Sequence, residues 1–123
     1  MVAVKPLRFI GSSRIDLQSF PKEVRQVLGE ELRRVQEGGM PRDFKPMPAV
    51  GHGVYEIRVS LEGAWRVLYV AKFADAVYVL HSFQKKTQQT AKDDIDLAKK
   101  RYQGKIIYLT QGSLSSTLSL VAV

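Results

Sequence analysis

Cationic side chains that could contact a phosphodiester gather in the middle of the 123-residue chain, within and just after strand-like segments. They are Arg58, Arg66, His81, Lys85 and Lys86. A charge inside an apolar strand is unfavourable unless it is paired or reaches solvent. Arg66 could therefore pair with Glu56 of the preceding strand, or it could present a planar guanidinium to a phosphate from a rigid sheet.

These side chains converge only if the strands that carry them are neighbours. Three segments have the composition of strands, at residues 54–59, 65–73 and 76–83. The turns at Glu62-Gly63 and Ala74-Asp75 are short, which predicts antiparallel hairpins. Alternation places Lys72 on the same face of its strand as Arg66, so it joins the predicted basic surface.

A basic sheet surface of this kind could cleave RNA without a metal. The 2′-hydroxyl of RNA is a nucleophile that the substrate itself supplies. The protein then needs a base near that hydroxyl, positive charge at the phosphorane and an acid for the leaving 5′-oxygen. Lysine or histidine could be the base, and arginine could stabilise the phosphorane charge.

Composition excludes several other chemistries. The chain has no cysteine, so disulfides, thiolate zinc sites and thiol nucleophiles are excluded. His52 and His81 lie far apart in sequence with no local carboxylate cluster, so we expect neither a metal nor another cofactor.

The charge balance favours polyanionic partners. Lys and Arg exceed Asp and Glu by 19 to 12, which gives a formal net charge of +7. The excess could also serve solubility alone. The segment MVAVKPLRFIG lacks the apolar run of a signal peptide, and no stretch approaches the ~20 apolar residues of a membrane span. We therefore expect a cytoplasmic protein with no membrane association.

The remaining segments predict an α+β fold. A first strand is expected at Leu7–Ile10, a short helix or turn at 13–20, and a firm helix from Pro21 to Gly38-Gly39 with an apolar stripe at spacings of three and four. The Pro- and Gly-rich segment 40–53 is predicted to be a loop.

The C-terminal part is predicted to hold one more helix. Thr90 has the character of an N-cap and Gly104 that of a terminator. A further strand could follow at 105–110. We expect one domain over residues 1–111 and a C-terminal tail over 112–123, whose Ser- and Leu-rich composition without a clear period makes it a candidate for disorder.

Several of these stretches together resemble the RelE/HigB toxin superfamily, with the closest likeness to its phage-related, HigB-like branch. They are GVYEIRV (53–59), WRVLYVAKF (65–73), VYVLHSFQKKTQQT (77–90), DIDLAKKRY (94–102) and the helical FPKEVRQVLGEELRRVQEGG (20–39). The resemblance covers about residues 5–104.

The resemblance implies a RelE-like fold, in which a small antiparallel sheet packs with N-terminal helices and a C-terminal helix. It also implies the toxin of a type II toxin–antitoxin module, a metal-independent endoribonuclease acting on ribosome-bound mRNA. Arg66 falls on the sheet arginine of the family, Arg58 on a basic position of the preceding strand, and Lys85 and Lys86 on the basic pair after the last core strand. His81 matches the pattern of the branch.

We therefore predict Arg66, His81, Lys85 and Lys86 as catalytic residues, and Arg58 and Lys72 as RNA-binding residues. The expected partners are the ribosome, its mRNA and a cognate antitoxin of the helix-turn-helix type. The division of acid and base roles stays open. So do two other functions: a ParE-like toxin that inhibits DNA gyrase without cleaving RNA, and an inactive relic that only binds its antitoxin.

Overall fold

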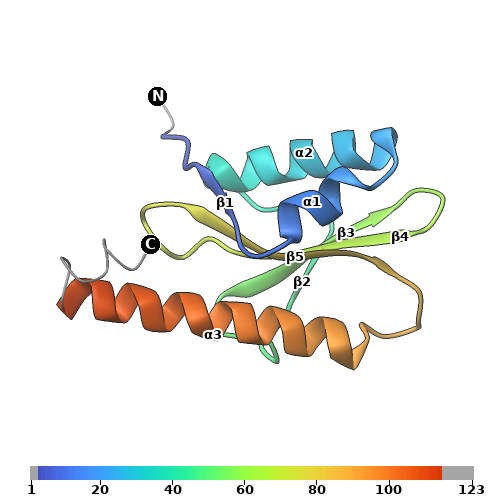
Figure 1. Cartoon of the computed structure of the whole chain (residues 1–123). Coiled ribbons are helices and arrows are strands. Elements are labelled where there is room, and N and C mark those ends of the chain that lie inside the picture. Colours follow the sequence, from blue (N-terminus) through green and yellow to red (C-terminus); the bar gives the residue numbers. More distant parts are fainter. Residues whose placement is uncertain (1–2, 115–123) are drawn as a thin grey trace.

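The sheet of this protein has five strands in the order β1-β5-β4-β3-β2 (Figure 1). The structure is a computed structural model that describes the backbone of residues 3–114 and the side chains of residues 3–105. The elements are β1 (Leu7–Phe9), α1 (Ser13–Gln18), α2 (Lys22–Gln36), β2 (Phe44–Pro46), β3 (Val54–Ser60), β4 (Ala64–Val70), β5 (Val77–Lys85) and α3 (Lys92–Leu114).

Antiparallel pairing dominates the sheet. Strands β3, β4 and β5 form a meander, as the short turns predicted, and β2 pairs antiparallel with β3 at one edge. Only β1 runs parallel to its neighbour, β5. Helices α1 and α2 lie on one side of the sheet and α3 on the other, which confirms the predicted α+β class (Figure 1).

Helix α2 seals one face of the sheet. Its apolar stripe is buried at Val24, Leu28, Leu32 and Val35, and it packs with alternate residues of the strands. On the sheet these partners are Ile57, Val59, Trp65, Val67, Tyr69, Val77 and Val79. A stripe of this width is what an amphipathic surface helix needs in order to cover a sheet.

Helix α3 covers part of the other face. Ala98 and Tyr102 of α3 are buried against a second cluster that includes Val70 and Tyr78. Tyr102 also donates a hydrogen bond to the His52 carbonyl over 2.8 Å, which ties α3 to the loop before β3.

Two local predictions were wrong. Segment 40–53 was expected to be a loop, but β2 forms within it; Pro46 is tolerated because β2 is an edge strand that need not donate on its outer side. The strand expected at 105–110 is instead part of α3, which continues past Gly104. One glycine inside a helix costs only about 1 kcal/mol relative to alanine, so Gly104 destabilises α3 slightly without ending it.

The start of α3 also differs from the expectation. Thr90 does not cap the helix, because its Oγ1 donates to Glu56 Oε2 over 2.9 Å and α3 begins two residues later, at Lys92. A domain boundary after residue 111 stays a prediction. Most of the expected tail, residues 115–123, lies outside the described residues.

None of the helices in the part of the chain that the structure describes is long and apolar enough to cross a membrane.

The close contact between Gly51 and Tyr102 predicts a strong effect of one methyl group. A Cβ at Gly51 would overlap the Tyr102 ring, which is held by hydrogen bonds to His52 and Lys72. We expect Gly51→Ala to lower the free energy of unfolding by about 1–3 kcal/mol in urea titrations. Gly29→Ala is the control: Gly29 lies within α2 with nothing within 4 Å of a new Cβ, so this variant should gain about 0.5–1 kcal/mol. Equal effects at both positions would contradict the packing argument.

Candidate nucleic-acid interface

A β-bulge in β5 decides which side chains share a face. Leu68 of β4 lies opposite His81, but the next residue, Tyr69, lies opposite Val79, so Leu80 is an extra residue in β5. Simple alternation from Val79 would turn His81 toward α2. With the extra residue, both His81 and Phe83 lie on the α3 side.

The register then brings most of the predicted basic residues to one end of that face. Arg66 of β4 lies directly opposite Arg58 of β3 and, on the other neighbouring strand, opposite Phe83 of β5. Lys85 lies opposite Ala64, and alternation puts it on the same face as Phe83. This end of the sheet lies beyond the start of α3.

The Arg66 side chain is almost fully buried, at 5% exposed, and partly satisfied. Its Nη1 donates to the Trp65 carbonyl over 2.9 Å, and its Nε lies 3.5 Å from Glu56 Oε1. No hydrogen bond from Nη2 is formed to the described residues. Burial lowers the pKa of Arg66; the Glu56 carboxylate opposes this shift, and the Arg58 charge adds to it.

Glu56 joins three elements. Its carboxylate is 2% exposed and contacts Arg66 of β4 through Oε1. Its other oxygen accepts the hydrogen bond from Thr90 in the segment that leads into α3. The pairing of Arg66 with Glu56 that the sequence allowed is therefore present as an ion pair, although Arg66 Nε forms no hydrogen bond within the described residues.

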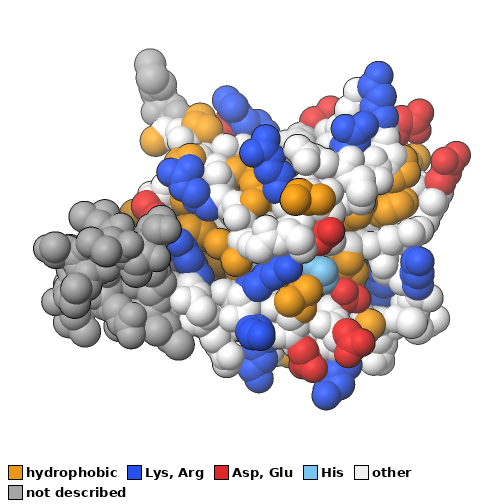
Figure 2. All heavy atoms as spheres, in the orientation of Figure 1, with side chains coloured by type: hydrophobic (Ala, Val, Ile, Leu, Met, Phe, Trp, Pro, Cys, Tyr) orange, Lys and Arg blue, Asp and Glu red, His pale blue; other side chains and the backbone are white. Residues whose placement is uncertain are grey.

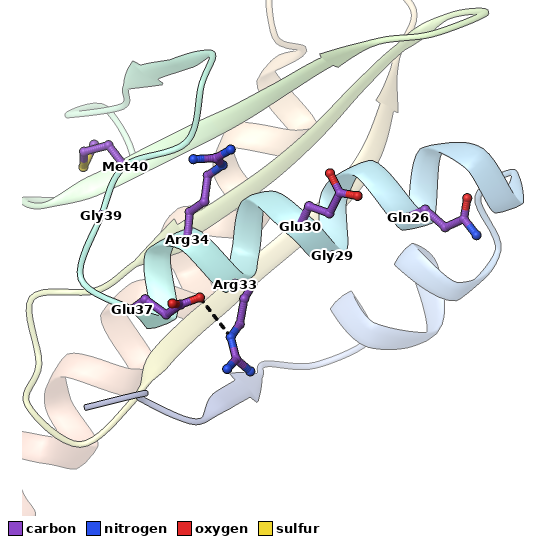
Figure 3. Close-up of a pocket in the computed structure, with 8 residues that line it drawn as sticks. All are labelled: Gln26, Gly29, Glu30, Arg33, Arg34, Glu37, Gly39 and Met40. Carbon is purple, nitrogen blue, oxygen red and sulfur yellow. Dashed lines mark hydrogen bonds and ion pairs between the residues drawn. The ribbon is translucent and has the colours of Figure 1, made fainter. Parts of the chain in front are cut away.

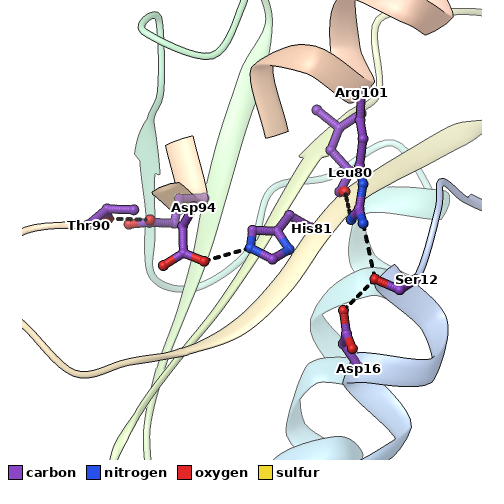
Figure 4. Close-up of polar contacts among 8 residues, drawn as sticks. Ser12, Asp16, Leu80, His81, Thr90, Asp94 and Arg101 are labelled. Carbon is purple, nitrogen blue, oxygen red and sulfur yellow. Dashed lines mark hydrogen bonds and ion pairs between the residues drawn. The ribbon is translucent and has the colours of Figure 1, made fainter. Parts of the chain in front are cut away.

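His81 is bonded to the first turn of α3. Its Nε2 lies 2.7 Å from Asp94 Oδ1, as Figure 4 shows, and its ring stacks on Phe83 with centroids 4.7 Å apart. The side chain is 7% exposed. Its Nδ1 is buried without a partner among the described residues. The sequence offered no direct signal for this pair, because the two residues lie 13 positions apart in different elements.

Lys85 and Lys86 diverge. Lys85 is half-buried on the Arg66 face and makes no ion pair with the described residues. Lys86 lines a hollow at the outer edge of β5, together with Trp65 and Asp16 from one side and His81 and Phe83 from the other. The two lysines therefore reach the two sides of one strand edge.

Lys72 is remote from this group. It lies six residues beyond Arg66, roughly 20 Å along an extended chain. Its Nζ donates to the Tyr102 hydroxyl over 3.0 Å and lies near the Phe73 and Tyr102 rings. These contacts stabilise the packing of α3 on the sheet. Lys72 therefore does not lie together with Arg66.

One basic residue near the group was missed. Lys45 of β2 lies directly opposite Glu56 and shares its face. It belongs to the segment that was expected to be a loop, so alternation could not be applied to it.

A larger hollow lies elsewhere among the described residues. It has a volume of about 1180 Å³ and runs along the outer surface of α2, between Gln26 and Met40 (Figure 3). Arg33 and Glu37 in its wall already pair with each other at 3.0 Å. It belongs to the face opposite Arg66 and contributes nothing to the basic group.

Two further observations bear on partners. No group of three or more His, Cys, Asp or Glu side chains that could hold a metal ion occurs within the described residues. Lys and Arg side chains are spread widely over the view in Figure 2, with acidic side chains between them, so the excess charge is not confined to one patch.

Comparison with known proteins identifies the family. Residues 15–103 match the model of the phage-derived Gp49-like family, DUF891. The chain belongs to the Gp49-like family. This family is part of the RelE/ParE toxin-like group, and membership indicates a toxin of the RelE/HigB type. The matched segment runs from α1 into α3 and includes every predicted site residue. No protein of curated function matches the chain.

The buried Arg66–Glu56 pair predicts non-additive effects on stability. Arg66→Met leaves the Glu56 carboxylate buried without its cation, and we expect a loss of about 3 kcal/mol in urea denaturation. Adding Glu56→Gln removes the unpaired charge, so the double variant should recover most of that loss. As a control, the exposed pair Arg33–Glu37 should change stability by less than about 1 kcal/mol when both are neutralised. A double variant at 56 and 66 no more stable than Arg66→Met would contradict this reading.

Proposed function

We propose that this protein is the toxin of a type II toxin–antitoxin module that cleaves ribosome-bound mRNA without a metal. The observation that carries the proposal is the direct opposition of Arg58 and Arg66 on neighbouring strands. Like charges directly opposite each other destabilise a sheet. A bound phosphate would offset that repulsion, since guanidinium groups match phosphate oxygens in a bidentate manner.

The surroundings of the two arginines support an RNA substrate. Lys85 adds a third cation on the same face. Glu56, the carboxylate that contacts Arg66, is shared with Thr90. The Arg66 guanidinium keeps hydrogen-bonding capacity for a phosphorane oxygen, since only Nη1 donates a hydrogen bond among the described residues. Stabilisation of charge that develops in the transition state is commonly the largest catalytic contribution.

The reaction proposed is attack by the 2′-oxygen on the adjacent phosphorus. The P–O5′ bond breaks, and the products are a 2′,3′-cyclic phosphate and a 5′-hydroxyl. One group must take the proton of the 2′-hydroxyl and another must protonate the 5′-oxygen. Lys85 and His81 are the proton-transfer groups proposed on this face, and Lys86 contacts the RNA backbone around the strand edge.

The proposed partner in the resting cell is a cognate antitoxin of the helix-turn-helix type. A chain of formal charge +7 would repel a basic partner, so the segment that silences the toxin should be acidic or apolar. Blocking access to the Arg58 and Lys85 face would be sufficient to prevent RNA binding.

Cleavage mapping tests the activity. Brief expression of the wild-type chain should arrest growth and produce cuts in translated mRNA by primer extension. Arg58→Gln should reduce the cleavage rate by about 10²-fold, the scale for loss of one charge-stabilising donor. The exposed residue Lys99 on α3 provides the control, and Lys99→Gln should cleave normally.

Cleavage should persist in EDTA and stop when the 2′-hydroxyl at the cut site is replaced by hydrogen. Growth arrest without cuts, accompanied by loss of DNA supercoiling, would instead favour a gyrase inhibitor.

The salt dependence of binding tests the phosphate contacts separately. For a 2′-deoxy oligonucleotide that cannot be cut, each lost contact should reduce the slope of log K against log salt by about 0.7–1. We expect this reduction for Arg58→Gln and for Lys85→Gln, measured by fluorescence anisotropy. An unchanged slope for Lys85→Gln, equal to that of Lys99→Gln, would remove Lys85 from the interface.

A further inference from the structure

A second hollow lies at the free edge of β5. Strand β1 pairs with β5 only over Val77–Val79, so no strand within the described residues pairs with the outer edge of β5 beyond that point. The C-terminal end of α1 approaches this edge. Between them lies a hollow of about 460 Å³ that reaches around this edge, lined by Asp16, Ser19, Phe20, Trp65, His81, Ser82, Phe83, Gln84 and Lys86.

The side chains that line the hollow include buried polar atoms without a hydrogen-bond partner among the described residues. Ser82 is 2% exposed, and its Oγ is buried without a hydrogen-bond partner among the described residues. A buried polar group without a partner is unusual and marks a place where a partner is missing. Alternate residues of an edge strand also turn backbone N–H and C=O groups outward. Gln84 adds an amide with both donors and an acceptor.

One wall of the hollow is aromatic. Phe20 and Trp65 pack with ring centroids 4.8 Å apart and an angle of 49° between the ring planes. The Trp65 Nε1 already donates to the Leu61 carbonyl over 3.0 Å, so the indole contributes apolar surface here. An aromatic wall beside mixed donors and acceptors suits a flat heterocycle with polar edges.

The hollow is adjacent to the proposed RNA face. Lys85 lies on the Arg66 face, and the next residue, Lys86, lines the hollow. An RNA strand with phosphates on Arg58 and Lys85 could therefore pass the end of β5 and turn one base around its edge. Lys86 would then contact the phosphate of that same nucleotide.

We propose that this hollow binds one nucleobase of the RNA substrate, read by Ser82, Gln84 and the free edge of β5. The inference rests on the proposed function for the identity of the ligand. Its volume lies within the range of small-ligand sites, and a compact ring would fit. An extended peptide would need a longer open edge than residues 80–85, which are bordered by Ser19 and Phe20.

Trp65 makes binding measurable without any catalytic assay. It is the only tryptophan of the chain, and it lies in the wall of the hollow. We expect at least one of the four nucleoside 5′-monophosphates to change its fluorescence saturably, whereas ribose 5-phosphate should not. Ser82→Ala should weaken this binding about 5–10-fold, the scale of one hydrogen bond. It should leave the unfolding free energy nearly unchanged, because the hydroxyl has no partner to lose.

Ser60→Ala, at an exposed position at the end of β3, should bind nucleotides like the wild type. Gln84→Leu gives a second, exposed variant that should also weaken binding. An equal response to ribose 5-phosphate would mean an anion site at Lys86 and overturn the proposal. So would no saturable response, or a response only to an acidic extended peptide. Nucleotide binding in a protein that cuts no RNA would overturn the nuclease and leave the base site standing.

Discussion

The buried carboxylate of Glu56 is the constraint on which the basic face depends. It lies within 3.5 Å of the Arg66 guanidinium and accepts the hydroxyl of Thr90 at 2.9 Å. The first contact lets a cation remain inside a sheet that also carries Arg58 directly opposite. The second fixes the segment through which the chain enters α3. Without this carboxylate, two opposed arginines would repel each other at the centre of the sheet with little to offset the repulsion.

The two faces of the sheet therefore have different roles. On the α2 side, a continuous apolar stripe closes the core. On the other side, α3 starts beside His81, through its bond to Asp94, and its buried residues Ala98 and Tyr102 cover the Val70 end. The opposite end, with Arg58 and Lys85, lies beyond the start of the helix. On this face, the Val70 end packs against α3 and the Arg58 and Lys85 end stays open to a ligand. The energetically unfavourable opposition of cations can therefore persist near a well-packed core.

Local patterns predicted most of the fold. Val54–Ser60 alternates with the period of a strand, and the apolar residues of Lys22–Gln36 recur with the period of a helix. Both periods arise because one side of each element is buried. The errors arose where weak local signals competed with contacts distant in sequence. β2 forms because the edge of β3 offers a partner, in spite of the prolines around it. Thr90 has the residue type of a cap, but a buried carboxylate from β3 takes its hydroxyl.

For the site, the sequence by itself determined the chemical types: cations on and after three neighbouring strands, no thiol, and a family membership carried by the same stretches. Tertiary structure decided which of these residues meet. One extra residue in β5, Leu80, turns His81, Phe83 and Lys85 to the face of Arg66. Lys86, the next residue, then points away from that face and lines the hollow at the strand edge. Lys72 shares a parity with Arg66 but is too far along the chain to join it. A bulge arises from pairing between strands, and local sequence does not encode it, so alternation alone assigns the wrong face to every residue beyond it.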